Sequence, residues 1–87
     1  MKYYVYILEC ADATLYTGIT TDVEKRVLAH NTLKTGASYT KARRPVKLVY
    51  IERCLDRSEA SKRECAIKKL SRTEKLHLIT QYALHNV

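Results

Sequence analysis

Reactive side-chain types gather in the first third of the chain, at spacings that could bring them to one site. Tyr6 and Tyr16 stand ten residues apart, Arg26 follows after another ten, and His30 follows four residues later. Residues four apart on a helix project from one side, so Arg26 and His30 should face the same region. A guanidinium binds anionic oxygens, and a tyrosine can accept a proton where nearby cations lower its pKa. We interpret this stretch as the floor of an active site.

Each of these residues also has a simpler structural interpretation. The helix dipole favours a histidine in the last turn of a helix, which would account for His30. Arg26 could be an ordinary surface arginine. The chain has seven tyrosines but neither Trp nor Phe, so several tyrosines must help to build the core. Spacing alone therefore leaves the structural and the catalytic interpretations open.

Glu64 is the candidate acidic residue, because it lies at the border of a predicted buried helix face. It falls between Ala60 and Ile67 in helical spacing. A carboxylate in such a place extends to solvent, pairs with a base or holds a metal. From spacing alone, a salt bridge is the favoured outcome.

A long basic loop is predicted over residues 32–45, with four positive charges and no acid. Loops of this length in compact domains are usually functional or disordered. Lysine, arginine and hydroxyl side chains suit phosphate oxygens, and an exposed tyrosine could stack on a base. The alternative is a mobile basic loop without a specific role. The candidate nucleic-acid-binding residues are Lys34, Tyr39, Lys41, Arg43, Arg44 and, just beyond the loop, Lys47.

The charge balance favours a polyanionic partner. Sixteen Lys and Arg residues against nine Asp and Glu residues give a formal net charge of +7. Such an excess on a small domain suits nucleic acid or an anionic membrane surface. No apolar run approaches the roughly 20 residues that span a membrane. We therefore expect nucleic acid and no membrane.

Cysteine usage indicates a reducing compartment. Cys10, Cys54 and Cys65 show no short paired spacing, which argues against a disulfide framework and against a zinc site. The N-terminus enters a predicted strand at once, so no signal peptide is expected. These features predict a cytoplasmic protein.

A hairpin and the helix after it must position the candidate residues. Segments 2–9 and 15–20 are rich in aromatic and β-branched residues, which is typical of strands. Both faces of segment 2–9 are apolar, so this strand should be central. Gly18 marks a close approach or a bulge. A helix should begin at the capping box Thr21–Glu24 and end near Asn31.

The second half of the chain should supply one more strand and two helices. The strand is expected over 46–54, and a helix from about 56 or 58 to 70. Asp56–Glu59 resembles a capping box at its start, with Asp in place of Ser or Thr. A last helix should begin at the capping box Ser71–Glu74. The order β-β-α-β-α-α predicts an α+β fold, a three-stranded antiparallel sheet flanked by helices, as one domain over 1–87. The expected core residues of the middle helix are Ala60, Ala66, Ile67 and Leu70.

Hairpin parity decides whether Tyr6 and Tyr16 can share a site. A two-residue turn that pairs Ala11 with Thr14 would put the two tyrosines on opposite faces of the sheet. An odd-length loop or a bulge puts them on one face. Because a shared site needs the second arrangement, we predict it.

The motifs of this chain resemble the GIY-YIG nuclease superfamily. Tyr4-Val5-Tyr6, followed after nine residues by Tyr16-Thr17-Gly18, is similar to its paired motif, with Tyr4 replacing the first glycine and Thr17 in the middle of the second triplet. Arg26, His30 and Glu64 match the places of its arginine, histidine and metal-binding glutamate. Small stand-alone members are similar over Gly36-Ala37-Ser38-Tyr39-Thr40, Arg43-Arg44-Pro45 and Leu48-Val49-Tyr50.

The resemblance implies a metal-dependent endonuclease that hydrolyses phosphodiester bonds in DNA, in DNA repair or recombination. It implies Tyr16 as the base and Tyr6 as the residue that orients water or phosphate. His30 would share the proton or position Tyr6, and Arg26 would bind the phosphate. Glu64 would hold one divalent cation, Mg²⁺ or Mn²⁺. No segment resembles a recognition helix, so selection should follow the shape of the DNA and not its sequence.

Two departures from the family pattern keep other functions open. Ile19 stands where many members carry a lysine, and Leu76 lies near the place where several carry an asparagine. A non-catalytic nucleic-acid-binding module that retains the fold fits both departures. A basic protein that binds another protein is the third possibility, and the sequence leaves a homodimer open.

Overall fold

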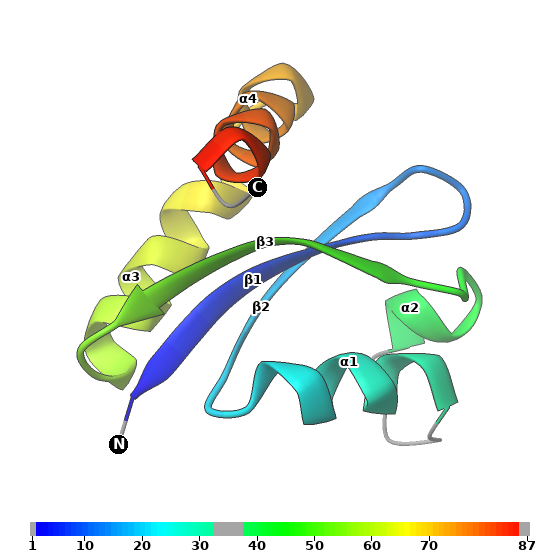
Figure 1. The fold of residues 1–87 in the computed structure, drawn as a ribbon, viewed down its shortest axis with the longest axis horizontal. Coiled ribbons are helices and arrows are strands. Elements are labelled where there is room, and N and C mark those ends of the chain that lie inside the picture. The colour runs from blue at the N-terminus through cyan, green and yellow to red at the C-terminus, as the bar shows by residue number, and fades with distance from the viewer. Residues whose placement is uncertain (1, 33–37, 86–87) are drawn as a thin grey trace.

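A computed structural model describes residues 2–32 and 38–85, with the backbone alone at residues 38 and 39. These residues form a three-stranded sheet with α1 and α2 on one side and α3 and α4 on the other (Figure 1). The predicted α+β fold and the predicted element order are confirmed. The strands are β1 (Tyr3–Glu9), β2 (Leu15–Thr20) and β3 (Lys47–Cys54). The helices are α1 (Val23–Thr32), α2 (Ser38–Lys41), α3 (Arg57–Lys68) and α4 (Arg72–His85).

The short helix α2 corrects the prediction of a continuous loop over 32–45. Its single turn lies inside that segment and contacts α1. Residues 33–37 of the same segment lie outside the described residues. A single helical turn has no apolar periodicity of its own, so sequence spacing gives no signal for it.

β1 is the central strand of an antiparallel sheet with the order β2-β1-β3. Its middle residues Val5, Tyr6, Ile7 and Leu8 are all buried, as expected for a strand covered on both faces. The β1–β3 pairing shifts between Ile7 and Leu8, because Ile7 pairs with Tyr50 but Leu8 pairs with Leu48. This bulge places Tyr50 on the α3 side and Leu48 on the α1 side.

The β1–β2 hairpin has the parity that a shared site requires. Tyr6 pairs with Gly18 and Leu8 pairs with Tyr16, so both tyrosines lie on one face. The loop has three residues, 11–13, closed by a 2.8 Å bond from Cys10 N to Thr14 O. Ala13 takes a left-handed φ of 69° there. The prediction of an odd-length loop is confirmed.

Side chains cap the N-termini of three helices. Asp22, not the predicted Thr21, accepts a hydrogen bond from Lys25 N at the start of α1. Asp56 accepts from Glu59 N at the start of α3, as predicted. At α4, Ser71 Oγ accepts from Glu74 N, and Glu74 Oε1 accepts from Ser71 N. This exchange confirms the predicted capping box, and it turns the chain sharply between α3 and α4.

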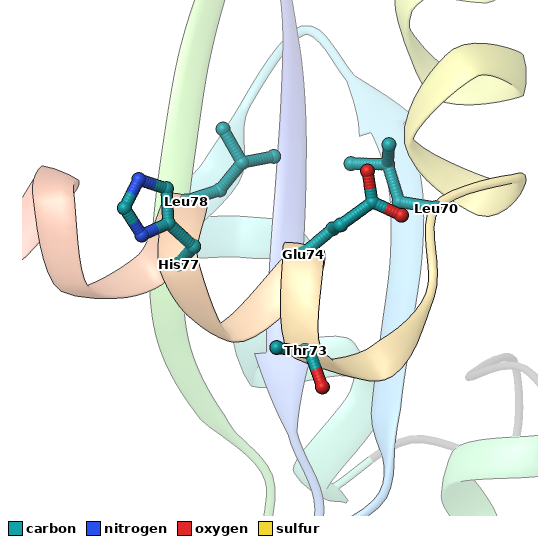
Figure 2. A pocket seen from close by; sticks show the side chains of 5 residues that line it. All are labelled: Leu70, Thr73, Glu74, His77 and Leu78. Atoms are coloured by element: carbon teal, nitrogen blue, oxygen red, sulfur yellow. The ribbon is translucent and has the colours of Figure 1, made fainter.

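The turn between α3 and α4 lines a surface pocket of about 410 Å³ (Figure 2). Leu70 and Leu78 form its apolar part, and Thr73, Glu74 and His77 complete it. Figure 2 shows these side chains on the first turns of α4 and, for Leu70, on the turn that follows α3. The pocket shares no residue with the site described below.

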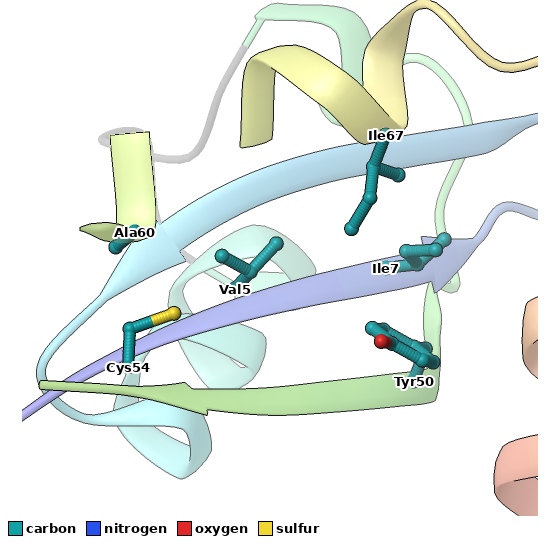
Figure 3. Packing of buried hydrophobic residues seen from close by; sticks show 6 residues of the cluster. All are labelled: Val5, Ile7, Tyr50, Cys54, Ala60 and Ile67. Atoms are coloured by element: carbon teal, nitrogen blue, oxygen red, sulfur yellow. The ribbon is translucent and has the colours of Figure 1, made fainter. Parts of the chain in front are cut away.

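The main core lies between the sheet and α3 (Figure 3). Of the four expected core residues of α3, Ala60 and Ile67 are buried, Leu70 is half-buried and Ala66 is exposed, so the expectation for Ala66 was wrong. Because 3.6 residues make a turn, Ala66 falls on the solvent side of Ile67. The buried cluster is Val5, Ile7, Tyr50, Cys54, Ala60 and Ile67, against which Leu78, Ile79 and Tyr82 of α4 pack.

Two other expectations concerned the cysteines and a membrane-spanning segment. All three cysteines are free, and only Cys65 is exposed. Among the described residues, no helix is both long enough and apolar enough to cross a membrane.

Candidate active site

Tyr6 is the centre of the candidate site. It projects from the middle of β1 to the α1 side of the sheet and is only 2% exposed. Its hydroxyl oxygen lies 3.0 Å from Nε2 of His30, which comes from the last turn of α1. A hydrogen bond between residues 24 positions apart therefore joins the sheet to the helix.

Gly18 gives the Tyr6 side chain its place. A Cβ built on Gly18 would lie 2.6 Å from the Tyr6 hydroxyl oxygen and 2.7 Å from Cζ. Real Cβ atoms essentially never come so close, so only glycine lets the phenol cross β2 at this point. The sequence expectation of a close approach at Gly18 is confirmed.

His30 is buried and has a hydrogen-bond partner on each ring nitrogen. Its side chain is 1% exposed. Nδ1 lies 2.8 Å from Oγ1 of Thr40, and Thr40 is fully buried. Burial lowers the pKa of His30, and the charges of Arg26 and Arg44 lower it further. The imidazole is therefore neutral near pH 7 and keeps one basic lone pair.

Tyr16 completes an aromatic cluster around His30. Its ring centroid lies 5.2 Å from that of His30 in an edge-on arrangement and 6.4 Å from that of Tyr6. Such tilted contacts between rings are favourable and fix their relative orientation. Tyr16 is only half-buried, so it forms the border between this cluster and solvent.

Charged residues from two helices act on the Tyr6 phenol. Burial raises the pKa of Tyr6 well above its usual value. Tyr16 and the Glu64 carboxylate raise it further, whereas the Arg26 guanidinium lowers it. Tyr6 is thus a neutral phenol in the folded protein. Its hydroxyl lies within electrostatic range of both Arg26 on α1 and Glu64 on α3.

Glu64 has the chemistry of a ligand for a hard cation. Its side chain is 24% exposed, and Lys68 lies 3.4 Å away in an i, i+4 ion pair. This ion pair confirms the interpretation that spacing favoured. In the part of the chain that the structure describes, no group of three or more His, Cys, Asp or Glu side chains could hold a metal together. A single carboxylate fits Mg²⁺, which retains several waters and accepts phosphate oxygens.

The predicted nucleic-acid-binding residues fall into three groups. Arg43 pairs with Asp12 at 3.0 Å, and Arg44 donates to the backbone carbonyls of His30 and Ala29. Lys41 and Lys47 have exposed side chains. Lys34 and the side chain of Tyr39 lie outside the described residues.

Thr40 and Asn31 are the site residues that sequence reasoning missed. Asn31 forms two hydrogen bonds with the backbone of Val46, at 2.7 and 3.1 Å, which anchor the end of α1 to the entry of β3. Thr40 lies in the segment interpreted as a loop, where no periodicity marks a buried position. The available signals were its hydroxyl and its place in the stretch Gly36–Thr40, where the chain resembles small stand-alone members of the family.

Known proteins resemble this chain over nearly its whole length. Residues 2–77 match the family model described as the GIY-YIG catalytic domain. A UPF0213 protein of Desulfotalea psychrophila is 61% identical over 77 residues, covering 88% of this chain and 70% of that protein. A UPF0213 protein of Syntrophus aciditrophicus is 61% identical over 80 residues, covering 92% of each.

Solved structures show the same fold. The solution NMR structure of a UPF0213 protein from Bacillus halodurans has a TM-score of 0.60 and 43% identity, covering 93% of this chain and 85% of that one. The solution NMR structure of an E. faecalis protein has a TM-score of 0.65 and 42% identity, covering 97% and 88%. Sequence and fold thus give the same assignment.

Proposed function

This chain belongs to the GIY-YIG family of catalytic domains, and from that premise we propose that it is an endonuclease that hydrolyses phosphodiester bonds in DNA. One observation carries the proposal: the other four predicted catalytic residues all act on Tyr6. His30 does so through a hydrogen bond, Tyr16 through a ring contact, and Arg26 and Glu64 through their charges. A purely structural buried tyrosine needs one hydrogen-bond partner, not such a set.

We assign the role of general base to Tyr6 and His30 acting as a pair. Burial makes the Tyr6 phenolate costly, so Tyr6 alone is a poor base at neutral pH. With His30 behind it, Tyr6 can take a proton from water while its own proton moves to Nε2. The products are hydroxide, a neutral phenol and an imidazolium. The hydroxide oxygen then bonds to phosphorus, the bond to the leaving oxygen breaks, and the leaving oxygen takes a proton from solvent.

Tyr16 and Arg26 hold the reacting groups in place. Arg26 is exposed on α1, and its planar fork can donate two hydrogen bonds to phosphate oxygens. Tyr16, the base that the family resemblance favours, here keeps the His30 ring in position and offers its hydroxyl as a donor to the phosphate. This proposal differs from what the family resemblance implies in which tyrosine passes on the proton.

Glu64 is the residue that would hold a divalent cation, Mg²⁺ or Mn²⁺. Such a cation, when bound, supplies Lewis-acid stabilisation of the charge that develops on the phosphoryl oxygens. In the absence of a cation, the Lys68 ammonium pairs with the Glu64 carboxylate. The Lys68 side chain is half-exposed, so it can move away when a cation binds.

Selection of the substrate should depend on shape. The net charge of +7 and the exposed Lys41 and Lys47 suit contacts with phosphates, which carry no sequence information directly. Helices α1, α3 and α4 each pack one face on the sheet, and none of them resembles a recognition helix in sequence. This favours branched, flapped or damaged DNA as the substrate and DNA repair or recombination as the setting.

Cleavage of a small DNA panel tests the proposal. Duplex, single strand, 5′ flap and four-way junction are incubated with Mg²⁺ or Mn²⁺ and, separately, with EDTA. We expect metal-dependent cuts that fall by a factor of about 10² to 10⁴ in Tyr6→Phe and His30→Gln, and that vanish in Glu64→Gln. Glu24→Gln, an exposed carboxylate of α1, is the matched control and should keep full activity.

Two outcomes would overturn the proposal. Cuts that persist in all three site variants indicate a contaminating nuclease. Tight, salt-dependent binding of the panel without any cut indicates the second function that the sequence left open, a nucleic-acid-binding module that retains the nuclease fold.

A further inference from the structure

Thr40 forms the far end of a buried chain of three polar side chains. Tyr6, His30 and Thr40 are 2%, 1% and 0% exposed, and hydrogen bonds of 3.0 and 2.8 Å join them. We propose that Thr40 is a positioning residue that fixes His30 as the tautomer with its proton on Nδ1. Nε2 is then left free to accept from Tyr6. The kinetic consequence of this inference rests on the proposed function, whereas the tautomer does not.

The donors and acceptors in the chain support one of two possible directions. In the first, the Tyr6 O–H donates to Nε2 and the Nδ1–H donates to Thr40 Oγ1. In the second, Thr40 donates to Nδ1 and the Nε2–H donates to Tyr6. A phenol is the stronger donor, with an ordinary pKa near ~10, far below that of an aliphatic hydroxyl. Matching the stronger donor to the imidazole lone pair favours the first direction.

Only the first direction also suits the proposed chemistry. An Nε2 that already carries a proton cannot take another one from Tyr6. With Thr40 as the acceptor at Nδ1, His30 can gain a proton on Nε2 while its bond to Thr40 remains unchanged. Thr40 therefore acts through His30 and does not touch the substrate.

The segment that carries Thr40 is fixed to His30 and to its surroundings at several points. Arg44 donates to the backbone carbonyl of His30, so residues 40–44 hold both the ring and the main chain of this histidine. Arg43 binds Asp12 in the hairpin loop, and Ala11 N donates to Arg43 O at 2.9 Å. These contacts keep the Thr40 hydroxyl in place.

Nitrogen NMR of His30 tests the tautomer directly. The chain has three histidines, and His77 and His85 are exposed, so His30 stands apart as the buried one. In the wild type we expect a protonated Nδ1 and an unprotonated Nε2. Thr40→Val keeps the shape but removes the hydroxyl, and it should shift the tautomer population toward Nε2–H. Thr40→Ser should restore the wild-type spectrum.

Cleavage kinetics give the second measurement. Thr40→Val should lower kcat about tenfold, the effect of one lost hydrogen bond, with little change in KM. Thr40→Ser should recover most of the loss. Thr80→Val is the matched control, because Thr80 is an exposed α4 residue that bonds to its own helix at Leu76 O. It should match the wild type in both measurements.

The outcomes separate this inference from the proposed function. A wild-type spectrum with the proton on Nε2, or a Thr40→Val spectrum identical to the wild type, overturns the role of Thr40. If the wild type cuts no DNA but the spectra change as expected, the proposed function fails and the positioning role of Thr40 stands. Should Thr40→Val fail to fold, the wild-type spectrum and Thr40→Ser still decide the direction of the chain.

Discussion

Gly18 lies directly opposite Tyr6 in the β1–β2 pair, and the Tyr6 phenol occupies the space that any larger residue at position 18 would need. Gly18, from the second motif, thus leaves the space that the Tyr6 side chain, from the first motif, requires. The conformational freedom of glycine plays no part here, because Gly18 has an ordinary strand φ.

Gly18→Ala should therefore disrupt the site more than its single methyl group suggests. The new Cβ must push Tyr6 away from His30, because its closest contact would be 2.6 Å. We expect a loss of stability of about 1 to 3 kcal/mol together with loss of the His30 tautomer signature. Urea unfolding and nitrogen NMR measure the two effects. Wild-type values in both would show that β2 can move away from the phenol without cost.

Stability should fall in mild acid because of His30. Burial and two arginines hold the pKa of His30 below its ordinary value of 6.5. The unfolded chain therefore binds the histidine proton first as pH falls, and the folded state loses stability from about pH 6.5 down to the lowered folded pKa. His30→Gln should remove this part of the pH dependence, measured by urea unfolding between pH 7.5 and 5. Equal slopes in both proteins would contradict the buried neutral imidazole.

Stability should also fall at alkaline pH, because of Tyr50. Burial, helped by the Glu52 carboxylate that accepts its hydroxyl at 2.6 Å, raises the pKa of Tyr50 to about 12. The unfolded tyrosine loses its proton near the ordinary value of 10, so its contribution to stability declines as pH rises from about 10 to 12. Tyr50→Phe should lack this decline and should cost about 1 kcal/mol at pH 7. The difference between the two proteins across that range is the measurement.

Ala13 is a place where the chain can be made more stable. Its φ of 69° lies in the left-handed region, which costs an alanine roughly 1 to 2 kcal/mol. Ala13→Gly should raise the free energy of unfolding by about 1 kcal/mol, after the entropy that glycine adds to the unfolded chain. Ala11→Gly, in the same loop without a left-handed φ, is the control and should be neutral or destabilising. A stabilisation by both variants would mean that the loop geometry is not the cause.

Lys41 and Lys47 should contribute to DNA binding through phosphate contacts. Each has an exposed side chain on the segment that leads from α2 into β3. Lys41→Gln and Lys47→Gln should each weaken binding uniformly across DNA sequences and lower the slope of log affinity against log salt by about 1. Lys75→Gln on α4 serves as the comparison and should leave the slope unchanged. An unchanged slope in Lys41→Gln and Lys47→Gln would indicate that DNA binds to another surface.

The sequence predicted the scaffold well because the scaffold follows periodic rules. Segments rich in aromatic and β-branched residues gave the first two strands, and the requirement that Tyr6 and Tyr16 share a face gave the odd-length hairpin loop. The caps at Asp56 and Ser71 followed from their spacing to a glutamate three residues later. At α1 the same rule chose Thr21, but the cap is Asp22, since Thr20 and Asp22 bond to each other and shift the helix start by one residue.

The missed features depend on contacts between distant residues, which spacing does not encode. Thr40 meets His30 only because α2 packs against α1, and nothing in the local sequence marks that contact. Arg43 and Arg44 read as free phosphate ligands in a basic run, yet each forms an internal contact, with Asp12 and with the end of α1. The run of basic residues therefore predicted a positively charged surface correctly, but it did not predict the partner of each residue.

The separation of the two sheet faces has a consequence for how such a chain can change over time. The core against α3 is built by Val5 and Ile7, whereas the reactive groups stand on their neighbour Tyr6, on the other side of the same strand. Substitutions at Tyr6, His30 or Thr40 need not open a cavity beneath α3, so descendants could lose or alter the reaction while they retain the fold. A shared fold among relatives is then weaker evidence of shared activity than the presence of Tyr6, His30 and Thr40 on the α1 side of the sheet.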